Sequence, residues 1–180
     1  MLTKKQLNWL SSLSDKDKIF IKAYDKKSPY YFERIKKYIR KEIDKKLIAE
    51  HHGASRLKIS GQDEIDIYVP ISKNNFDEYV DKFKMFFGVP RSLYKNNRAR
   101  FVSEKFGKHI DIFIIDNESE DWKSLNIFEE YLLTQPEQLS FYEKLKEDSA
   151  NLGMRSYYKN KLEFINHILK VSSSSKLPRK

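Results

Sequence analysis

Apolar and polar residues alternate along two stretches in the middle of the chain, which is the pattern of half-buried β-strands. At 64–70 the apolar side chains Ile65, Ile67 and Val69 point to one face and the polar ones to the other. The stretch 109–115 repeats this two-residue period. With shorter apolar runs added, the prediction places strands at 47–51, 64–70, 100–106 and 109–115, and a short strand or extended arm at 19–24.

Other stretches carry apolar residues three or four positions apart, which is the spacing of one helix face. The clearest follows Pro29, a residue suited to a helix start, and its stripe is Phe32, Ile35, Ile39 and Ile43. In the last helix the predicted stripe is Tyr158, Leu162, Ile165 and Leu169. The predicted helices span 2–12, 30–45, 75–86, 121–133, 136–150 and 155–171, with a basic loop at 89–98.

These elements predict an α+β protein, in which helices pack beside a small sheet. The length of 180 residues suits one domain, or a core domain with an appended segment. We place the core, together with the N-terminal helix, at 1–116 and a helical segment packed on it at 117–171. The serine-rich basic end, 172–180, is expected to be disordered.

Composition narrows the class of protein. Hydrophobic residues make up 39% of the chain and aromatic residues 14%, which is enough for a packed core despite 34% charged residues. The lack of cysteine excludes disulfides and thiolate metal sites, and no apolar run approaches the roughly 20 residues of a membrane span. We therefore expect a cytoplasmic protein without membrane contact. The net charge of +9 has two open interpretations: attraction to nucleic acid or polyphosphate, and an ordinary lysine-rich surface.

Carboxylates on the predicted strands form a candidate metal site. Glu64 and Asp66 point to the same strand face about 7 Å apart, a spacing that suits a shared cation. If the strand of Asp111 is their neighbour, its carboxylate converges with them. Oxygen ligands of this kind suit Mg²⁺, with Mn²⁺ as the alternative. Glu64 and Asp66 would hold one or two ions, and Asp111 would complete the site or act as base toward an acceptor hydroxyl.

The residues before this strand suit a phosphate chain. Gly53 and Ser55 belong to a turn of small residues, where backbone N–H groups can approach a phosphate closely. Arg56 and Lys58 lie in the short basic connection that follows the turn. Together with Lys161 of the last helix, they would neutralise the charge of a triphosphate.

Each of these residues also has a structural interpretation, which stays open. A solvated strand acid is the alternative for Glu64, and an ion pair with a lysine is the alternative for Asp111. Arg56 and Lys58 are also explained as loop charges, and Lys161 as a lysine on a helix surface. Zinc is disfavoured because no common zinc spacing is matched by the histidines His51, His52 and His109.

Several short motifs occur in a fixed order between residues 19 and 171. They are Tyr24-Asp25, Glu50-His51-His52-Gly53-Ala54-Ser55, Ile65-Asp66-Ile67, His109-Ile110-Asp111-Ile112-Phe113, Trp122 and Phe128-Glu129-Glu130-Tyr131-Leu132. In this order and spacing, the chain resembles the GrpB family of the nucleotidyltransferase superfamily. The resemblance implies a nucleotidyltransferase-like small mixed sheet flanked by helices, with a C-terminal helical segment.

The chain departs from the pattern of that family in ways that bear on activity. Typical members carry a histidine where this chain has Asp111, and they lack an acid at the position of Glu64. The turn also differs, because the family has Gly-Ser followed by a longer link. The first two departures bring the sequence closer to the three acids of catalytically competent members of the superfamily, which favours transfer chemistry.

We therefore predict Mg²⁺-dependent transfer of a nucleoside monophosphate from an NTP to an acceptor of unidentified class. The alternative is a non-catalytic module that binds a nucleotide, a nucleic acid or a protein through its basic surface. A third interpretation is an antitoxin-like or regulatory protein. A thermal shift that needs both Mg²⁺ and an NTP would favour the enzyme, and a salt-sensitive shift with nucleic acid alone would favour the module.

Overall fold

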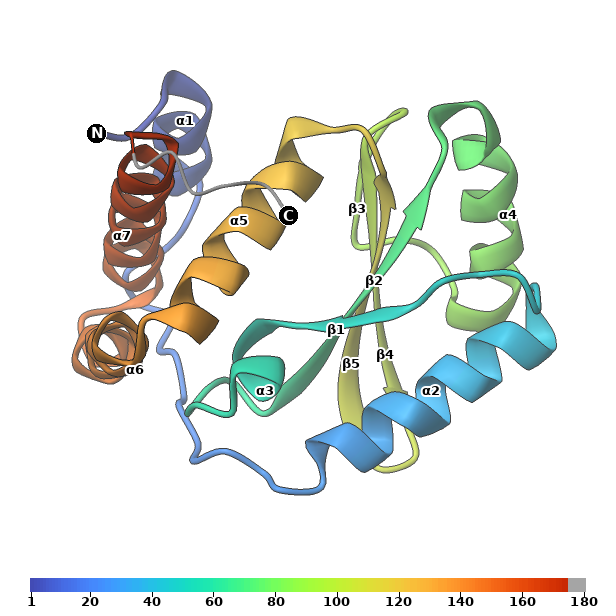
Figure 1. Ribbon diagram of the computed structural model, residues 1–180, viewed down its shortest axis with the longest axis horizontal. Coiled ribbons are helices and arrows are strands. Elements are labelled where there is room, and N and C mark those ends of the chain that lie inside the picture. Colours follow the sequence, from blue (N-terminus) through green and yellow to red (C-terminus); the bar gives the residue numbers. More distant parts are fainter. Residues whose placement is uncertain (175–180) are drawn as a thin grey trace. The chain divides into compact units, whose positions relative to one another are not determined.

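The computed structural model describes residues 1–174, which form two compact units. The first, here called the sheet unit, comprises Tyr24–Ile59 and Asp63–Lys123 and contains a five-stranded sheet of order β1-β2-β5-β4-β3 (Figure 1). Strands β2 and β5 are parallel, and the other neighbouring pairs are antiparallel. The strands are β1 (Glu50–His52), β2 (Glu64–Ile71), β3 (Ser92–Tyr94), β4 (Arg98–Lys105) and β5 (Lys108–Asp116). A mixed sheet with helices confirms the predicted α+β class.

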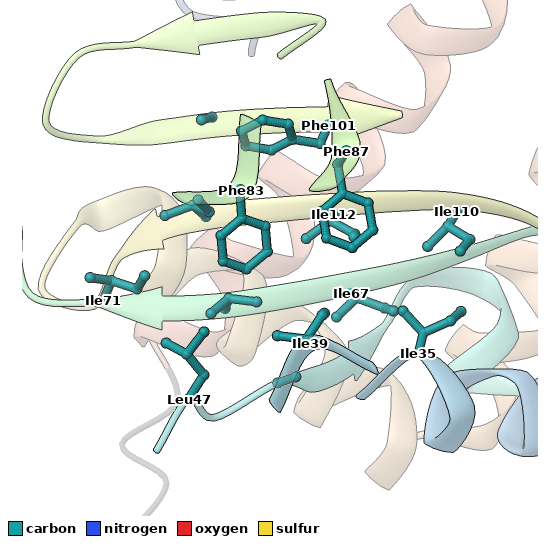
Figure 2. Close-up of a cluster of buried hydrophobic side chains, with 14 of the residues drawn as sticks. Ile35, Ile39, Leu47, Ile67, Ile71, Phe83, Phe87, Phe101, Ile110 and Ile112 are labelled. Carbon is teal, nitrogen blue, oxygen red and sulfur yellow. The ribbon is translucent and has the colours of Figure 1, made fainter. Parts of the chain in front are cut away.

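One face of this sheet is apolar and packs against two helices. The side chains that β2 and β5 turn to this face are fully buried, namely Ile65, Ile67, Val69, Ile110, Ile112 and Ile114. Helices α2 (Ser28–Glu42) and α4 (Phe76–Phe87) cover them, and Figure 2 shows their buried side chains Ile35, Ile39, Phe83 and Phe87. Burial of each such side chain contributes roughly 1.5–3 kcal/mol. The opposite face of the sheet carries the polar side chains of β2 and β5 together with the stacked rings of Tyr68 and Phe113.

Helix boundaries in this unit follow local sequence signals. Helix α2 has Pro29 in its first turn, as predicted. Helix α4 follows a 3₁₀ turn, η1 (Lys73–Asn75), and carries Asp77 and Glu78 where they complement the positive end of the helix dipole. The helix ends before Gly88, whose φ of +78° favours glycine.

Two short elements were not predicted, and one strand begins elsewhere. Helix α3 (Gly53–Leu57) occupies most of the expected turn and basic connection, and β3 lies within the expected loop 89–98. A single helical turn and a three-residue strand are too short for a period to appear in the sequence. The first strand is Glu50–His52 instead of 47–51, because its pairing with β2 begins at Glu50.

The second unit, here called the helical unit, comprises Met1–Ala23, Ser60–Gln62 and the chain from Ser124. It contains α1 (Lys4–Ser11), α6 (Pro136–Ala150), α7 (Met154–Ser174) and most of α5 (Glu120–Thr134). Thr3 and Gln6 form a capping box at the start of α1. Trp9 of α1 meets Tyr158 of α7 edge-on, with 5.1 Å between ring centroids. The N-terminal helix, grouped with the sheet in the prediction, thus contacts the last helix.

The chain between α3 and β2 is bound within the helical unit. Lys22 and Gly61 exchange two backbone hydrogen bonds of 2.7 and 2.9 Å, so the predicted arm at 19–24 is extended. The Ser60 N–H donates to Glu143 Oε1 at 2.7 Å. The buried Lys146 Nζ donates to the Ser60 carbonyl oxygen. Helix α6 therefore holds this connection through both backbone polar groups of Ser60.

The buried stripe of α7 differs from the predicted one. The buried residues are Tyr157, Phe164 and Ile168, and Tyr142 of α6 stacks on Phe164 with ring centroids 5.3 Å apart. The predicted residues are only partly buried: Tyr158, Leu162, Ile165 and Leu169. Both stripes have helical spacing, so periodicity alone does not choose between neighbouring faces of a helix that is apolar on more than one side.

Helix α7 continues to Ser174 and so enters the stretch 172–180 that was expected to be disordered. No proline or glycine interrupts it there, and Ser173 Oγ donates to the Leu169 carbonyl oxygen at 2.5 Å in the last turn. Residues 175–180 of the predicted tail lie outside the described residues. Among the helices of residues 1–174, none combines the length and apolar character that crossing a membrane requires.

Candidate metal centre

Strands β2 and β5 place four polar side chains on the face of the sheet opposite the apolar core. In their parallel register, Glu64 lies opposite His109 and Asp66 lies opposite Asp111. Neighbouring strands are about 4.8 Å apart, and side chains two positions apart point the same way. The register thus makes the strands of Asp66 and Asp111 neighbours, which is the arrangement that the sequence required for converging acids.

Three of these side chains meet closely enough to share a cation. Glu64, His109 and Asp111 each offer one ligand atom, and these atoms lie within 4.8 Å of one another. Two carboxylates and an imidazole are all ligands of divalent metals. The structure therefore brings together two of the three predicted acids and adds His109, which the prediction did not include.

Asp111 is the most buried member of the cluster, with 2% of its side chain exposed. Its Oδ2 accepts a 2.5 Å hydrogen bond from Arg100 Nη2 of β4, so its ion-pair partner is an arginine and not a lysine. Its Oδ1 is buried and has no hydrogen-bond donor within the described residues. The Nε2 atom of His109 lies 4.0 Å from this oxygen. A buried carboxylate oxygen without a donor is costly, and a cation at Oδ1 would offset that cost.

His109 is oriented by a second carboxylate. Its Nδ1 lies 2.8 Å from Glu104 Oε1, its cross-strand partner on β4. Metal-binding histidines almost always make such a bond through the nitrogen that does not face the metal. The bond leaves Nε2 on the side of Asp111. This arrangement fits a metal ligand and could have been suspected from the His-x-Asp spacing on one strand face.

The starts of both strands are tied together one residue before the cluster. Lys108 precedes His109, and its Nζ contacts Asp25 Oδ2 at 3.2 Å and also Asp63, the residue before Glu64. Burial lowers the pKa of Lys108, but the hydrogen bonds that its Nζ donates to Asp63 and Asp25 outweigh it and leave the pKa raised. The cationic lysine thereby holds Glu64 and His109 in register.

Asp66 is directed to the start of α3 instead of to the cluster. A Cβ atom built on Gly53 would lie 1.9 Å from Asp66 Oδ2, so the carboxylate occupies the space beside this glycine. Gly53 also has a φ of +75°, which favours glycine. The predicted glycine turn and the predicted acid are therefore adjacent.

The hydroxyl of Ser55 is already engaged. Ser55 is buried, and its Oγ lies 2.9 Å from His51 Nε2. The His51 ring stacks on Phe32 with centroids 4.7 Å apart. Burial, with unfavourable electrostatic interactions with His52 and Arg56 as smaller causes, lowers the pKa of His51 to about 4. Neutral His51 therefore fixes the predicted phosphate-binding serine in place.

The fold and this geometry can be compared with known proteins. A family model described as GrpB protein matches residues 18–171. The chain belongs to the GrpB family. The chain is also similar to the solved structure titled "Crystal structure of conserved protein GrpB from Enterococcus faecalis", with 17% identity, a TM-score of 0.68, and coverage of 86% of this chain and 98% of that chain. This likeness concerns the fold. No curated protein gives a significant match.

The remaining predicted residues of this GrpB protein lie outside the cluster. Arg56 is on α3 and partly buried, whereas Lys58 is exposed and caps α3 in the left-handed conformation, with φ 59°. Lys161 is on α7 in the helical unit, where its Nζ lies 5.4 Å from the centroid of Tyr157 and 5.5 Å from that of Tyr158. Their roles toward a triphosphate stay predictions.

Proposed function

We propose that this GrpB protein is a divalent-cation-dependent nucleotidyltransferase, built on a fold of the nucleotidyltransferase superfamily. It would transfer a nucleoside monophosphate from an NTP to an acceptor hydroxyl. The observation that carries the proposal is the buried Oδ1 of Asp111, which has no hydrogen-bond donor within the described residues and lies beside His109. A cation bound there would compensate the charge of this oxygen.

The donor set bears on the choice of metal. Two carboxylates suit Mg²⁺, which prefers oxygen ligands and usually keeps several waters. The imidazole of His109 makes Mn²⁺ the better candidate, because Mn²⁺ stands with Mg²⁺ in its preference for carboxylates and is the softer ion toward nitrogen. Glu64, His109 and Asp111 would hold such an ion, and the chemistry it would supply is neutralisation of the triphosphate's charge.

The other groups of the site would position the reactants. The small residues at the start of α3 would let the triphosphate approach the backbone, with Arg56 and Lys58 beside it. The acceptor oxygen would form its bond to the α-phosphorus as the bond to pyrophosphate breaks. Asp66, which lies next to Gly53, would hold a second ion or take the proton of the acceptor.

A non-catalytic nucleotide-binding module is the second candidate, and one observation favours it. Arg100 supplies a positive charge to Asp111 from within the protein, at 2.5 Å. An acidic cluster that is partly neutralised in this way needs less compensation from a metal. Such a module would bind an NTP and release it unchanged.

Calorimetric titration with Mn²⁺ and Mg²⁺ tests the metal centre. We expect the wild type to bind Mn²⁺, and Asp111→Asn and His109→Gln to bind it at least about tenfold more weakly, as loss of a ligand or of its support requires. Asp77→Asn, which removes an exposed acid of α4, is the matched control and should bind as the wild type does. Equal affinity for Mn²⁺ in Asp111→Asn and the wild type would refute the proposed metal centre.

Catalysis is tested separately by pyrophosphate release. Each NTP is incubated with the wild type and Mn²⁺ in the presence of small hydroxyl compounds, RNA or protein acceptors. Metal-dependent release of pyrophosphate that is lost in Asp66→Asn supports the transferase. Tight binding of Mn²⁺ and NTP without release under any of these conditions would favour the module.

A further inference from the structure

The edge of the sheet that begins at β3 carries an uninterrupted run of positive charge. Between residues 91 and 100 the chain has four cationic residues and no acid. We call this set the basic edge, and its members are Arg91, Lys95, Arg98 and Arg100. Arg91 directly precedes β3, Lys95 lies in the turn between β3 and β4, and Arg98 and Arg100 lie on β4; β3 is the last strand in the sheet order (Figure 1).

Aromatic rings lie beside the two cations of β4, Arg98 and Arg100, on one face of the sheet. Tyr94 pairs with Arg98, and Arg100 pairs with Phe113, so all four side chains point to the face of the metal centre. The Arg98 guanidinium carbon lies 5.4 Å from the centroid of Tyr94. That of Arg100 lies 5.8 Å from the centroid of Phe113. With 42% of its surface exposed, Tyr94 presents a ring to solvent.

Most of this charge is not compensated by acids. No carboxylate lies within ion-pair distance of Arg91, Lys95 or Arg98 in the part of the chain that the structure describes. On the other side of the sheet, by contrast, Lys82 and Lys84 of α4 each pair with an acid of the same helix. These two lysines of α4 are thus compensated within their own helix, whereas the three cations of the basic edge are not.

The hairpin that carries these residues is held by backbone hydrogen bonds. The Arg91 N–H donates to the Arg100 carbonyl oxygen at 2.7 Å, and the Asn97 N–H donates to that of Tyr94 at 3.0 Å. The Asp116 N–H donates to the carbonyl oxygen of Asn97 at 2.8 Å. Its charges and rings are thus pre-arranged, which lowers the ordering cost of binding.

We propose that the basic edge binds single-stranded nucleic acid. Cations that are not paired with acids attract phosphates, and an exposed ring among them gives an unpaired base a surface to stack on. An acidic peptide would use the charges but not the ring. The bond between Arg100 and Asp111 makes the edge continuous with the metal centre. If the proposed transfer reaction holds, the nucleic acid is its acceptor, whereas the binding itself requires neither metal nor NTP.

Fluorescence anisotropy tests the binding alone, with chelator present and NTP absent. The probes are labelled oligonucleotides of about 12 nucleotides, oligo-U and oligo-dT, a length suited to one such site. Three phosphate contacts, one for each cation that is not paired with an acid, predict a slope of log K against log salt of about −2.1, that is about 18-fold weaker binding at 200 mM than at 50 mM salt. Binding of either probe with such a slope supports the proposal.

Variants at exposed positions locate the site without threatening the fold. Arg91→Gln/Lys95→Gln should make the slope shallower by about 1.4, since each lost contact removes about 0.7. Tyr94→Ala should weaken binding at least about fivefold, the equivalent of the lower bound of 1 kcal/mol for a stacked base. The matched control, Lys37→Gln/Lys45→Gln, removes two exposed cations at α2 and just after it and should bind as the wild type does.

Several results would overturn the proposal. They are the absence of binding at about 50 mM salt, an equal loss in the edge and control variants, and binding that does not change in Tyr94→Ala. Displacement of the probe by polyglutamate as effectively as by unlabelled oligonucleotide would point to an acidic protein partner instead. Tighter binding of the corresponding duplex would overturn the assignment to single strands.

Discussion

Replacement of Gly53 by alanine tests the packing of α3 against β2. The added Cβ would stand 1.9 Å from Asp66 Oδ2 and 2.8 Å from its Cγ, far inside van der Waals contact. The φ of +75° adds about 1–2 kcal/mol for any side chain other than hydrogen. Displacement of the carboxylate adds about 1–3 kcal/mol, the usual cost of overpacking. We therefore expect Gly53→Ala to lower the free energy of unfolding by about 2–5 kcal/mol.

Gly107 provides a matched control in the same unit. Its φ is +74°, and a Cβ there would have no heavy atom within 4 Å, so Gly107→Ala should cost only the backbone part, about 1–2 kcal/mol. In a protein of this size 1 kcal/mol lowers the Tm by about 2–4 °C. Thermal unfolding followed by circular dichroism should therefore place the Tm of Gly53→Ala about 2–12 °C below that of Gly107→Ala.

A double variant isolates the collision itself. Asp66→Ala removes Oδ2 and Cγ, so Gly53→Ala/Asp66→Ala should be more stable than the sum of the two single effects predicts. Equal melting of Gly53→Ala and Gly107→Ala would refute the reasoning. Strict additivity in the double variant would do the same, because it would mean that the two residues do not touch.

Three further outcomes follow from the site. Arg100→Gln should lower the free energy of unfolding by about 1–3 kcal/mol, because the buried Asp111 loses an ion-pair partner that is itself 37% exposed. Mn²⁺ should raise the Tm of this variant more than that of the wild type. An equal rise would contradict the idea that Arg100 and the metal share the Asp111 carboxylate. Glu104→Gln should weaken Mn²⁺ binding about 10- to 100-fold in calorimetry by releasing His109, and unchanged affinity would remove its orienting role. His51 has a pKa of about 4 in the folded protein and 6.5 in the unfolded chain, so its contribution to the free energy of unfolding is fully present above pH 6.5 and falls by at most about 3 kcal/mol toward pH 4. Urea unfolding across this range should show a weaker pH dependence of that free energy in His51→Gln than in the wild type. An identical pH dependence in the two proteins would be inconsistent with this account.

The sequence predicted the long elements because their periods had room to appear. Strand β2 has 8 residues and β5 has 9, and in each an aliphatic side chain recurs at every second position. Helix α2, with 15 residues, repeats its stripe over several turns. By contrast, β3 has 3 residues and owes its existence to pairing with β4, which no local pattern records. The stripe of α7 was misassigned because the contacts of a neighbouring helix, and not periodicity, decide which apolar face is buried.

The candidate site was predictable in part. The period of two placed Glu64, Asp66 and Asp111 on strand faces, but their relation depends on the parallel pairing of β2 with β5, which is a tertiary choice. The position of Arg100 near Asp111 could also have been predicted, because a tight turn at Gly107 fixes the register of β4 on β5. The direction of the Asp66 side chain toward Gly53 could not be predicted, because the sequence pattern does not distinguish between the rotamers of a side chain.

During synthesis of this chain, the connection 60–62 is made well before the residues of α6 that bind it. Glu143 and Lys146 follow Ser60 by 83 and 86 positions, so at roughly 5–20 residues per second they emerge several seconds later. Until then, water must satisfy the backbone of Ser60. An isolated fragment spanning residues 24–123 would lack α6, so the N–H and carbonyl oxygen of Ser60 would have neither of these partners. A fragment of residues 24–123 is therefore a poor choice for expression on its own, although it contains all the residues of the sheet unit.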